Sequence, residues 1–226
     1  MTRLLQLFSI GIKRVGKPSV IMEPPINNVT YFDKTDIARS INYLVKAFIV
    51  ILFAIALFVP ISYLEGKAMG MRVPLFVGSA LVIPVYERFR KVGRVPYPHV
   101  ADAFLVLPFV VDTFANVAGL YENFAVTDDI LHCINWVFLV CAFQAFRYRR
   151  NRQNPDAILL GAGFGALAIV IWEIMEWAVD TSGAGGGLGL TYGDTIGDLT
   201  LSTSGGVIGS LIGVYWLGAL REVSSE

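Results

Sequence analysis

The stretch AILLGAGFGALAIVIWEIMEWAV, residues 157–179, decides the fold of this chain. A helix that crosses a lipid bilayer needs roughly 20 predominantly apolar residues. This stretch is longer than that, and Glu173 and Glu176 are its only charged residues. It therefore predicts a transmembrane helix that carries two acidic side chains near one end.

Five further apolar stretches accompany it, at residues 43–63, 71–86, 100–120, 130–146 and 196–220, and the second of these is interrupted by Pro74 and Pro84. The composition agrees, since 55% of the residues are hydrophobic and 16% are charged, against roughly 25% charged in soluble domains. We therefore expect an all-α integral membrane protein. Residues 41–220 would form a six-helix transmembrane bundle, residues 1–40 a cytoplasmic or interfacial N-terminal segment, and residues 221–226 a short cytoplasmic tail.

Successive loops are alternately rich and poor in lysine and arginine, and this pattern predicts how the protein is oriented in the membrane. Cytoplasmic loops of membrane proteins carry an excess of these residues. The basic loops hold Arg88, Arg90, Lys91 and Arg94 after the second stretch and RYRRNRQ, residues 147–153, after the fourth. Lys67 and Arg72 are the only basic residues in the opposite set of loops. We expect both termini to be cytoplasmic and the protein to reside in the inner membrane.

The balance of charge also excludes one class of partner. The chain has 18 basic and 18 acidic residues and no formal net charge. Nucleic-acid binding depends on an excess of basic residues on one face, so we expect no nucleic-acid partner.

Small residues are concentrated in the last apolar stretch, in TSGGVIGSLIG, residues 203–213. Glycines four residues apart lie on one face of a helix and let two helix backbones approach closely. Gly205, Gly209 and Gly213 have this spacing. We expect them to serve helix packing.

Acidic residues gather at the predicted non-cytoplasmic end of four stretches. Two alternatives compete with a functional interpretation. The acids at helix starts, such as Asp128 and Asp194, are also favourable capping residues. The second alternative is that the other acids pair with buried cations, but stretches three to six contain no lysine or arginine. Acids without such partners must be protonated, hydrated or bound to a cation.

The single histidine at this level, His132, follows Asp128 and Asp129 by one helical turn. Carboxylates with one imidazole suit divalent ions such as Mg²⁺, Mn²⁺, Ca²⁺, Zn²⁺ or Fe²⁺. The expected metal ligands are Asp129, His132, Glu173, Glu176, Asp194 and Asp198, and the expected supporting residues are Asp112, Asn116, Asp128 and Asn135. A proton or cation pathway and a purely structural polar core are the alternatives.

Several of these segments resemble the YjdF-like bacterial inner-membrane proteins. The resemblance rests on DDILHCIN at 128–135, WEIMEW at 172–177 and YGDTIGDL at 192–199, together with LPFVVDTFANVAGLY at 107–121. It covers about residues 100–215 and implies a membrane protein without naming its chemistry. The order of aspartate, histidine and glutamate is also similar to VanZ-like proteins, although this chain lacks the arginine that usually follows the glutamate there.

The leading functional hypothesis from the sequence is a divalent-metal site that opens to the non-cytoplasmic side. It would support hydrolysis or transfer on a lipid-linked or other amphipathic small molecule in the membrane, with Glu173 or Glu176 as the catalytic base. The alternatives are a proton- or cation-coupled transporter and a non-catalytic, VanZ-like binding or resistance protein.

Overall fold

A computed structural model describes residues 36–65, 67, 69–90, 96–148, 156–183 and 190–223, and every regular element in these ranges is helical. The elements are α1 (Asp36–Phe58), the short 3₁₀ helix η2 (Ser62–Leu64), α2 (Met69–Phe89), α3 (His99–Val117), α4 (Leu120–Asn123), α5 (Thr127–Tyr148), α6 (Ala157–Thr181) and α7 (Tyr192–Val223). The expectation of an all-α chain is confirmed for these residues. Most of the expected N-terminal segment, residues 1–35, lies outside the described residues, as do residues 224–226 of the tail.

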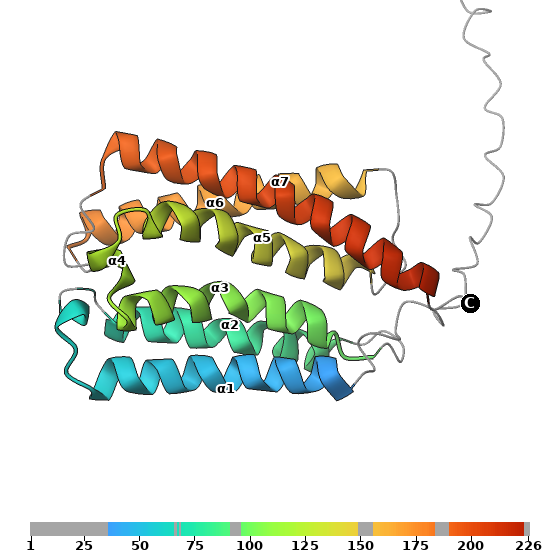
Figure 1. The fold of residues 1–226 in the computed structure, drawn as a ribbon, viewed down its shortest axis with the longest axis horizontal. Coiled ribbons are helices and arrows are strands. Elements are labelled where there is room, and N and C mark those ends of the chain that lie inside the picture. The colour runs from blue at the N-terminus through green and yellow to red at the C-terminus, as the bar shows by residue number, and fades with distance from the viewer. Residues whose placement is uncertain are drawn as a thin grey trace, which may run out of the picture.

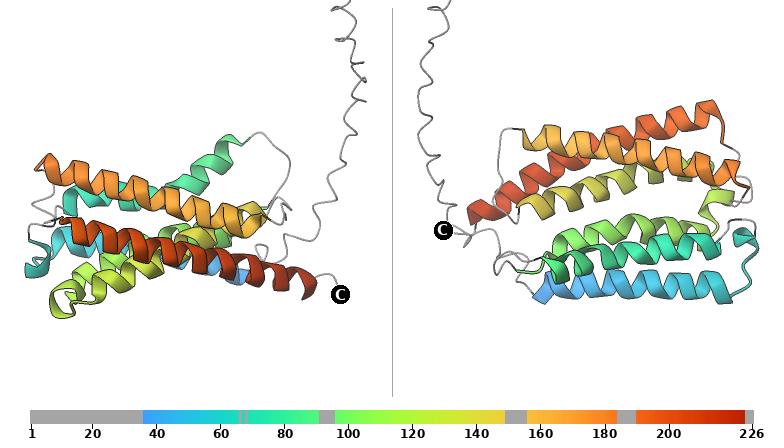
Figure 2. Two further views of the ribbon diagram at one scale, coloured as in Figure 1. Left: turned by 90° about the horizontal axis from the view of Figure 1, so that it is seen from above. Right: turned by 180° about the vertical axis from the view of Figure 1, so that it is seen from behind.

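The six long helices run roughly side by side as one bundle (Figures 1 and 2). Helix α1 packs on α3, α3 packs on α5, and α7 packs on both α5 and α6. The short helix α4 lies at one end of the bundle, together with the ends of α1, α3 and α6 and the starts of α2, α5 and α7. We call this the α4 end. The opposite end carries the start of α1 and the C-terminal part of α7.

Four of the described helices are long and apolar enough to cross a membrane, namely α1, α3, residues Thr127–Arg147 of α5, and α6. Helices α2 and α7 correspond to the other two expected spans but do not meet this criterion. Helix α2 nevertheless runs without a break through Pro74 and Pro84, and α7 is the longest helix of the bundle at 32 residues. Helix α2 has 21 residues, so both helices reach the roughly 20 residues that are needed to cross a bilayer.

Helix α1 begins at Asp36, seven residues before the predicted apolar stretch. The sequence there is polar, so hydrophobicity alone does not mark it as part of the span. Its polar residues Asn42 and Lys46 are one helical turn apart, and Asn42 is fully buried. The first two turns of α1 therefore bring polar groups into the bundle at the end opposite α4.

An apolar core joins the first three helices and anchors the bundle. Ile49 and Phe53 of α1 pack with Phe76 of α2 and with Val106 and Val110 of α3. Between helices surrounded by lipid, close van der Waals packing of such side chains is what favours association. Trp172 of α6 packs against the same cluster, so this core also fixes the position of the residue next to Glu173.

The glycines of α7 permit very close packing on α5, as the sequence predicted. A Cβ atom added at Gly209 would lie 2.6 Å from the carbonyl oxygen of Val137 and 2.9 Å from its Cα atom. A Cβ atom at Gly205 would collide with the carbonyl group of Cys133, and one at Gly213 would lie 2.8 Å from the Cβ atom of Gln144. These are largely contacts with backbone, so α7 can occupy this position only because the residues are glycine. This approach places the acids of α7 beside the histidine of α5.

Candidate metal centre

His132 of α5 lies between two carboxylates at the α4 end. Its Nε2 atom is 3.7 Å from Oδ1 of Asp128 and 3.4 Å from Oδ1 of Asp198 on α7. These distances exceed the usual range for an N–H···O hydrogen bond. One potential ligand atom from each of the three residues lies within 4.8 Å of the others. A divalent ion bonds such ligands at about 2.0–2.6 Å, so ligands on its opposite sides are roughly 4–5 Å apart. The three groups therefore fit around one ion, and we call Asp128, His132 and Asp198 the trio.

The local sequence explains why these three side chains meet. Asp128 and His132 are four residues apart and share one face of α5. The Nδ1 atom of His132 is 3.1 Å from Oγ of Ser202, which is fully buried on α7. Because Ser202 and Asp198 are also four residues apart, one face of α7 supplies both the carboxylate and the group that orients the imidazole. Such a contact to the second ring nitrogen is the usual way in which a metal-binding histidine is held.

Glu173 of α6 is the most deeply buried carboxylate beside this trio. Its residue is only 8% exposed, and its Oε1 atom has no hydrogen-bond partner among the residues that the structure describes. The carboxylate interacts electrostatically with His132, Asp194 and Asp128. A buried carboxylate oxygen without a partner is costly. Glu173 therefore has one oxygen available for a proton, a water molecule or an ion.

Aromatic rings line the membrane-centre side of the trio. The imidazole of His132 stacks on Trp136, with ring centroids 6.3 Å apart, and Trp136 meets Trp172 edge to face. The indole nitrogen of Trp136 donates a hydrogen bond of 3.1 Å to the carbonyl oxygen of Gly165. These contacts separate the polar trio from the apolar core and hold His132 from a second side.

The other predicted ligands surround the trio at different depths. Asp129 and Asp194 are exposed, and Glu176 is partly buried. Asp194 and Glu176 still lie near enough to interact electrostatically with Asp128 or Asp198. The structure thus brings Asp128, which the sequence predicted only as a supporting residue, to His132. Asp129, a predicted ligand, points elsewhere, because each residue of a helix is rotated by about 100° from its neighbour.

Asn135, another predicted supporting residue, lies one turn beyond His132 on α5. Its side chain is partly buried. Its Oδ1 atom is buried without a hydrogen-bond partner in the described part of the chain. Asn135 therefore adds a second unpaired oxygen to this region of the bundle.

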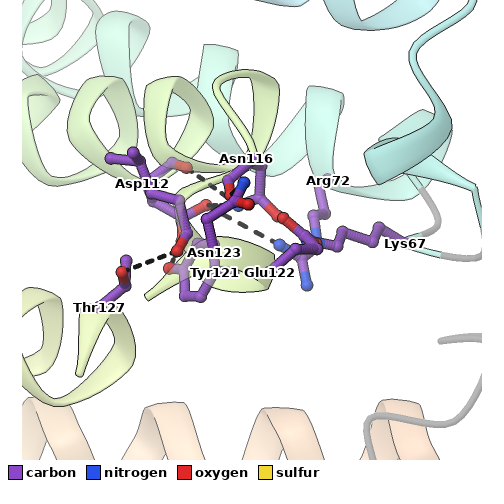
Figure 3. Close-up of polar contacts among 10 residues, drawn as sticks. Lys67, Arg72, Asp112, Asn116, Tyr121, Glu122, Asn123 and Thr127 are labelled. Atoms are coloured by element: carbon purple, nitrogen blue, oxygen red, sulfur yellow. Dashed lines mark hydrogen bonds and ion pairs between the residues drawn. The ribbon is translucent and has the colours of Figure 1, made fainter. Parts of the chain in front are cut away.

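Asp112 and Asn116 of α3 belong to a different polar network (Figure 3). Oδ1 of Asp112 accepts a hydrogen bond of 2.6 Å from the hydroxyl of Tyr121, and Oδ2 is 3.8 Å from Nη1 of Arg72. The amide oxygen of Asn116 accepts a hydrogen bond of 3.0 Å from Nζ of Lys67. The sequence-based expectation that the acids of stretches three to six lack cationic partners is wrong for Asp112. The cation, Arg72, comes from the first turn of α2, outside stretches three to six.

Tyr121 is held as a hydrogen-bond donor within this network. Burial raises the pKa of its hydroxyl well above the ordinary value, and the neighbouring Asp112 raises it further. The hydroxyl therefore stays protonated and fixes the rotamer of Asp112.

Sequence reasoning assigned no role to Asp102, which forms a buried polar cluster at the end opposite α4. Its carboxylate is fully buried, and its Oδ2 atom is 2.5 Å from Nζ of Lys46. The same oxygen accepts hydrogen bonds from the hydroxyl of Tyr97 at 2.5 Å and from Nδ2 of Asn42 at 2.9 Å. Burial, followed by the contact with Asp102, raises the pKa of the Tyr97 hydroxyl, which therefore remains a donor. The sequence did contain one signal for this cluster, because Asn42 and Lys46 are four residues apart in the polar start of α1 and so lie on one face of the helix.

The described structure is that of a helical protein with several apolar spans and a cluster of polar groups at each end, which defines a multi-pass membrane protein. A family model described as "Predicted membrane protein (DUF2238)" matches residues 41–219. The chain belongs to this family. Searches of curated proteins and of solved structures found no match.

Proposed function

We propose that this protein is a multi-pass protein of the bacterial inner membrane that binds a divalent metal ion at the α4 end. In this proposal all six long helices span, both termini are cytoplasmic and the α4 end faces away from the cytoplasm. The support is the excess of lysine and arginine in the loops that would lie opposite α4. Within the family, the segments DDILHCIN, WEIMEW and YGDTIGDL favour placement with the YjdF-like proteins.

The observation that carries the proposal is the group of Asp128, His132 and Asp198 together with the unpaired oxygen of Glu173. Without a cation, several carboxylates in a low-dielectric setting repel one another and must take up protons. A divalent ion removes this repulsion. The imidazole, oriented by Ser202, adds a ligand that suits Zn²⁺, Mn²⁺ or Fe²⁺ as well as the carboxylates do.

A metal ion at this place would support hydrolysis or group transfer. It would lower the pKa of a bound water molecule and stabilise developing negative charge. Glu173 is placed to accept the proton of that water, since it lies beside the trio and has a free oxygen. Glu176, one turn further along α6, interacts electrostatically with Glu173 and is the second candidate for this role.

The surroundings of the trio favour a substrate that is partly embedded in lipid. Large apolar side chains are exposed on the helices that carry the acids, namely Ile130 on α5, Ile174 and Trp177 on α6, and Ile196 on α7. Polar groups bordered by exposed apolar side chains suit an amphipathic molecule that keeps its chain in the membrane. We therefore propose a lipid-linked substrate.

Metal binding at the trio predicts a characteristic melting behaviour in detergent. An ion that binds only the folded state stabilises it, by ~2.7 kcal/mol at a hundredfold excess over its dissociation constant. Added Mn²⁺ or Zn²⁺ should raise the melting temperature of the wild type, and chelator should lower it. The effect should be larger at pH 8 than at pH 5, where protons compete for the ligands.

Asp128→Asn and His132→Ala should each remove this response to metal, whereas Asp129→Asn should keep it. Asp129 is a matched control because it is the adjacent aspartate on the same helix and its side chain is exposed. A wild type whose melting temperature ignores both chelator and added metal would reject the proposal. Equal loss of the response in Asp128→Asn and Asp129→Asn would reject the assignment of the ligand.

A further inference from the structure

Arg72, in the first turn of α2, forms one long ion pair, with Asp112, and no hydrogen bond to a residue that the structure describes. Its closest polar contact in the described part of the chain is the 3.8 Å approach of Nη1 to Oδ2 of Asp112, which is too long for a hydrogen bond. Both oxygens of Asp112 already accept other donors, from Tyr121 and, at 3.3 Å, from Asn116. A guanidinium group carries five donors, and here none of them makes a hydrogen bond to a described residue.

The neighbouring cation is used differently. Lys67 forms an ion pair with Glu122, donates a hydrogen bond of 3.0 Å to Asn116, and lies over the ring of Tyr121 at 5.1 Å from its centroid. These contacts tie the segment before α2 to α3 and α4, as Figure 3 shows. These three contacts occupy the ammonium group of Lys67, whereas the guanidinium group of Arg72 has only the longer ion pair with Asp112.

The position of Arg72 is also unusual for a basic residue. With Lys67, it is the only basic residue in the set of loops and helix ends that the charge pattern assigns to the non-cytoplasmic side. Lysine and arginine are disfavoured in short loops on that side. The side chain of Arg72 is 28% exposed, and its guanidinium group has unused hydrogen-bond donors beside the ion pair with Asp112. Such a group can still bind an anion.

The anion would lie next to the candidate metal centre. Asp112, which contacts Arg72, accepts a hydrogen bond from Tyr121. The residue before Tyr121, Leu120, accepts through its carbonyl oxygen a hydrogen bond of 2.9 Å from Thr127, which directly precedes Asp128 of the trio. The network around Arg72 and the trio are therefore adjacent parts of one polar region. Guanidinium groups bind phosphate oxygens in a fixed two-pronged geometry, and divalent ions bind the same oxygens.

We propose that Arg72 binds the phosphate group of the substrate that the metal centre acts on, and hence that the substrate is a phosphate ester or diphosphate. The inference rests on the proposed function for the reaction at the metal, but binding by Arg72 can be tested alone. The carboxylates of the region would repel this anion in the absence of metal, so a bound divalent ion should tighten phosphate binding.

The test measures binding of dioctanoyl phosphatidic acid to the purified full-length protein in detergent, with Mn²⁺ and separately with chelator. Dioctanoylglycerol, which lacks the phosphate, and inorganic phosphate are the comparison ligands. Arg72→Gln should weaken binding of the phosphatidic acid by about tenfold or more, because hydrogen bonds to charged groups are lost. Arg72→Lys should restore only part of the affinity.

Arg88→Gln is the matched control, because Arg88 is an exposed arginine in the last turn of the same helix, and it should bind like the wild type. Inorganic phosphate that competes with the lipid only when Arg72 is present would support the same site with free phosphate as its ligand. Equal affinity of wild type and Arg72→Gln for the phosphatidic acid, with both variants folded by circular dichroism, would overturn the inference. Failure of the proposed function is a separate result, in which Arg72-dependent binding is the same with Mn²⁺ and with chelator.

Discussion

Lys46→Met is expected to destabilise the protein by about 3–5 kcal/mol, the usual cost of leaving one member of a buried ion pair without its partner. Asp102 is fully buried, and its Oδ2 atom is 2.5 Å from Nζ of Lys46. The remaining donors to this carboxylate, from Tyr97 and Asn42, are neutral. They cannot replace the positive charge. Chemical unfolding in mixed micelles, followed by circular dichroism, measures the free energy of unfolding.

Two further variants show that the loss comes from the unpaired charge. In Lys46→Met combined with Asp102→Asn, the negative charge is also removed while the acceptor for Tyr97 remains, so more than half of the lost stability should return. Arg39→Met is the control, because Arg39 pairs with Asp36 on the exposed surface of the same helix. That pair should contribute about 0–1 kcal/mol. A double variant no more stable than Lys46→Met alone would contradict this explanation.

Gly209→Ala is expected to cost about 1–3 kcal/mol, as overpacking of a close contact does. The added Cβ atom would lie 2.6 Å and 2.9 Å from backbone atoms of Val137, and backbone cannot rotate away as a flexible side chain does. Helix α7 would therefore have to move away from α5. The melting temperature in detergent, monitored by tryptophan fluorescence, should fall clearly below that of the wild type.

The same substitution at Gly163 or Gly197 provides the comparison. A Cβ atom at either position would meet nothing within 4 Å, and alanine has the higher helix propensity, so these variants should be at least as stable as the wild type. Because α7 carries Asp198 and Ser202, Gly209→Ala should also weaken metal binding. Equal melting temperatures for Gly209→Ala and Gly163→Ala would show that α7 does not depend on this close approach.

The helical architecture could be predicted because its signals are local. Long apolar stretches and the spacing of Gly205, Gly209 and Gly213 directly indicate helices and a close packing face. The gathering of acids at one end was likewise visible once the stretches were placed in order. The start of α1 was missed because its first turns are polar, and a polar turn inside a bundle looks like a loop in a hydropathy pattern.

The detailed composition of each polar cluster could not be read from the sequence. Asp128 and Asp129 both lie within one turn of His132, and which of them faces α7 depends on the rotation of α5, which packing against α7 sets. The pairing of Asp112 with Arg72, and of Asp102 with Lys46, joins helices that are distant in the sequence. Such contacts depend on the vertical register between neighbouring helices, which no local pattern records.

The central claim is that Asp128, His132 and Asp198 hold a divalent metal ion, and the metal content of the purified protein tests it most directly. The full-length protein, incubated with a mixture of Mg²⁺, Ca²⁺, Mn²⁺ and Zn²⁺ and then separated from free ions by gel filtration, is examined by elemental mass spectrometry. We predict about one ion per chain in the wild type and in Asp129→Asn, and a strongly reduced content in Asp128→Asn and Asp198→Asn. A wild type that retains no divalent ion, or variants of the trio that retain as much as the wild type, would contradict the claim.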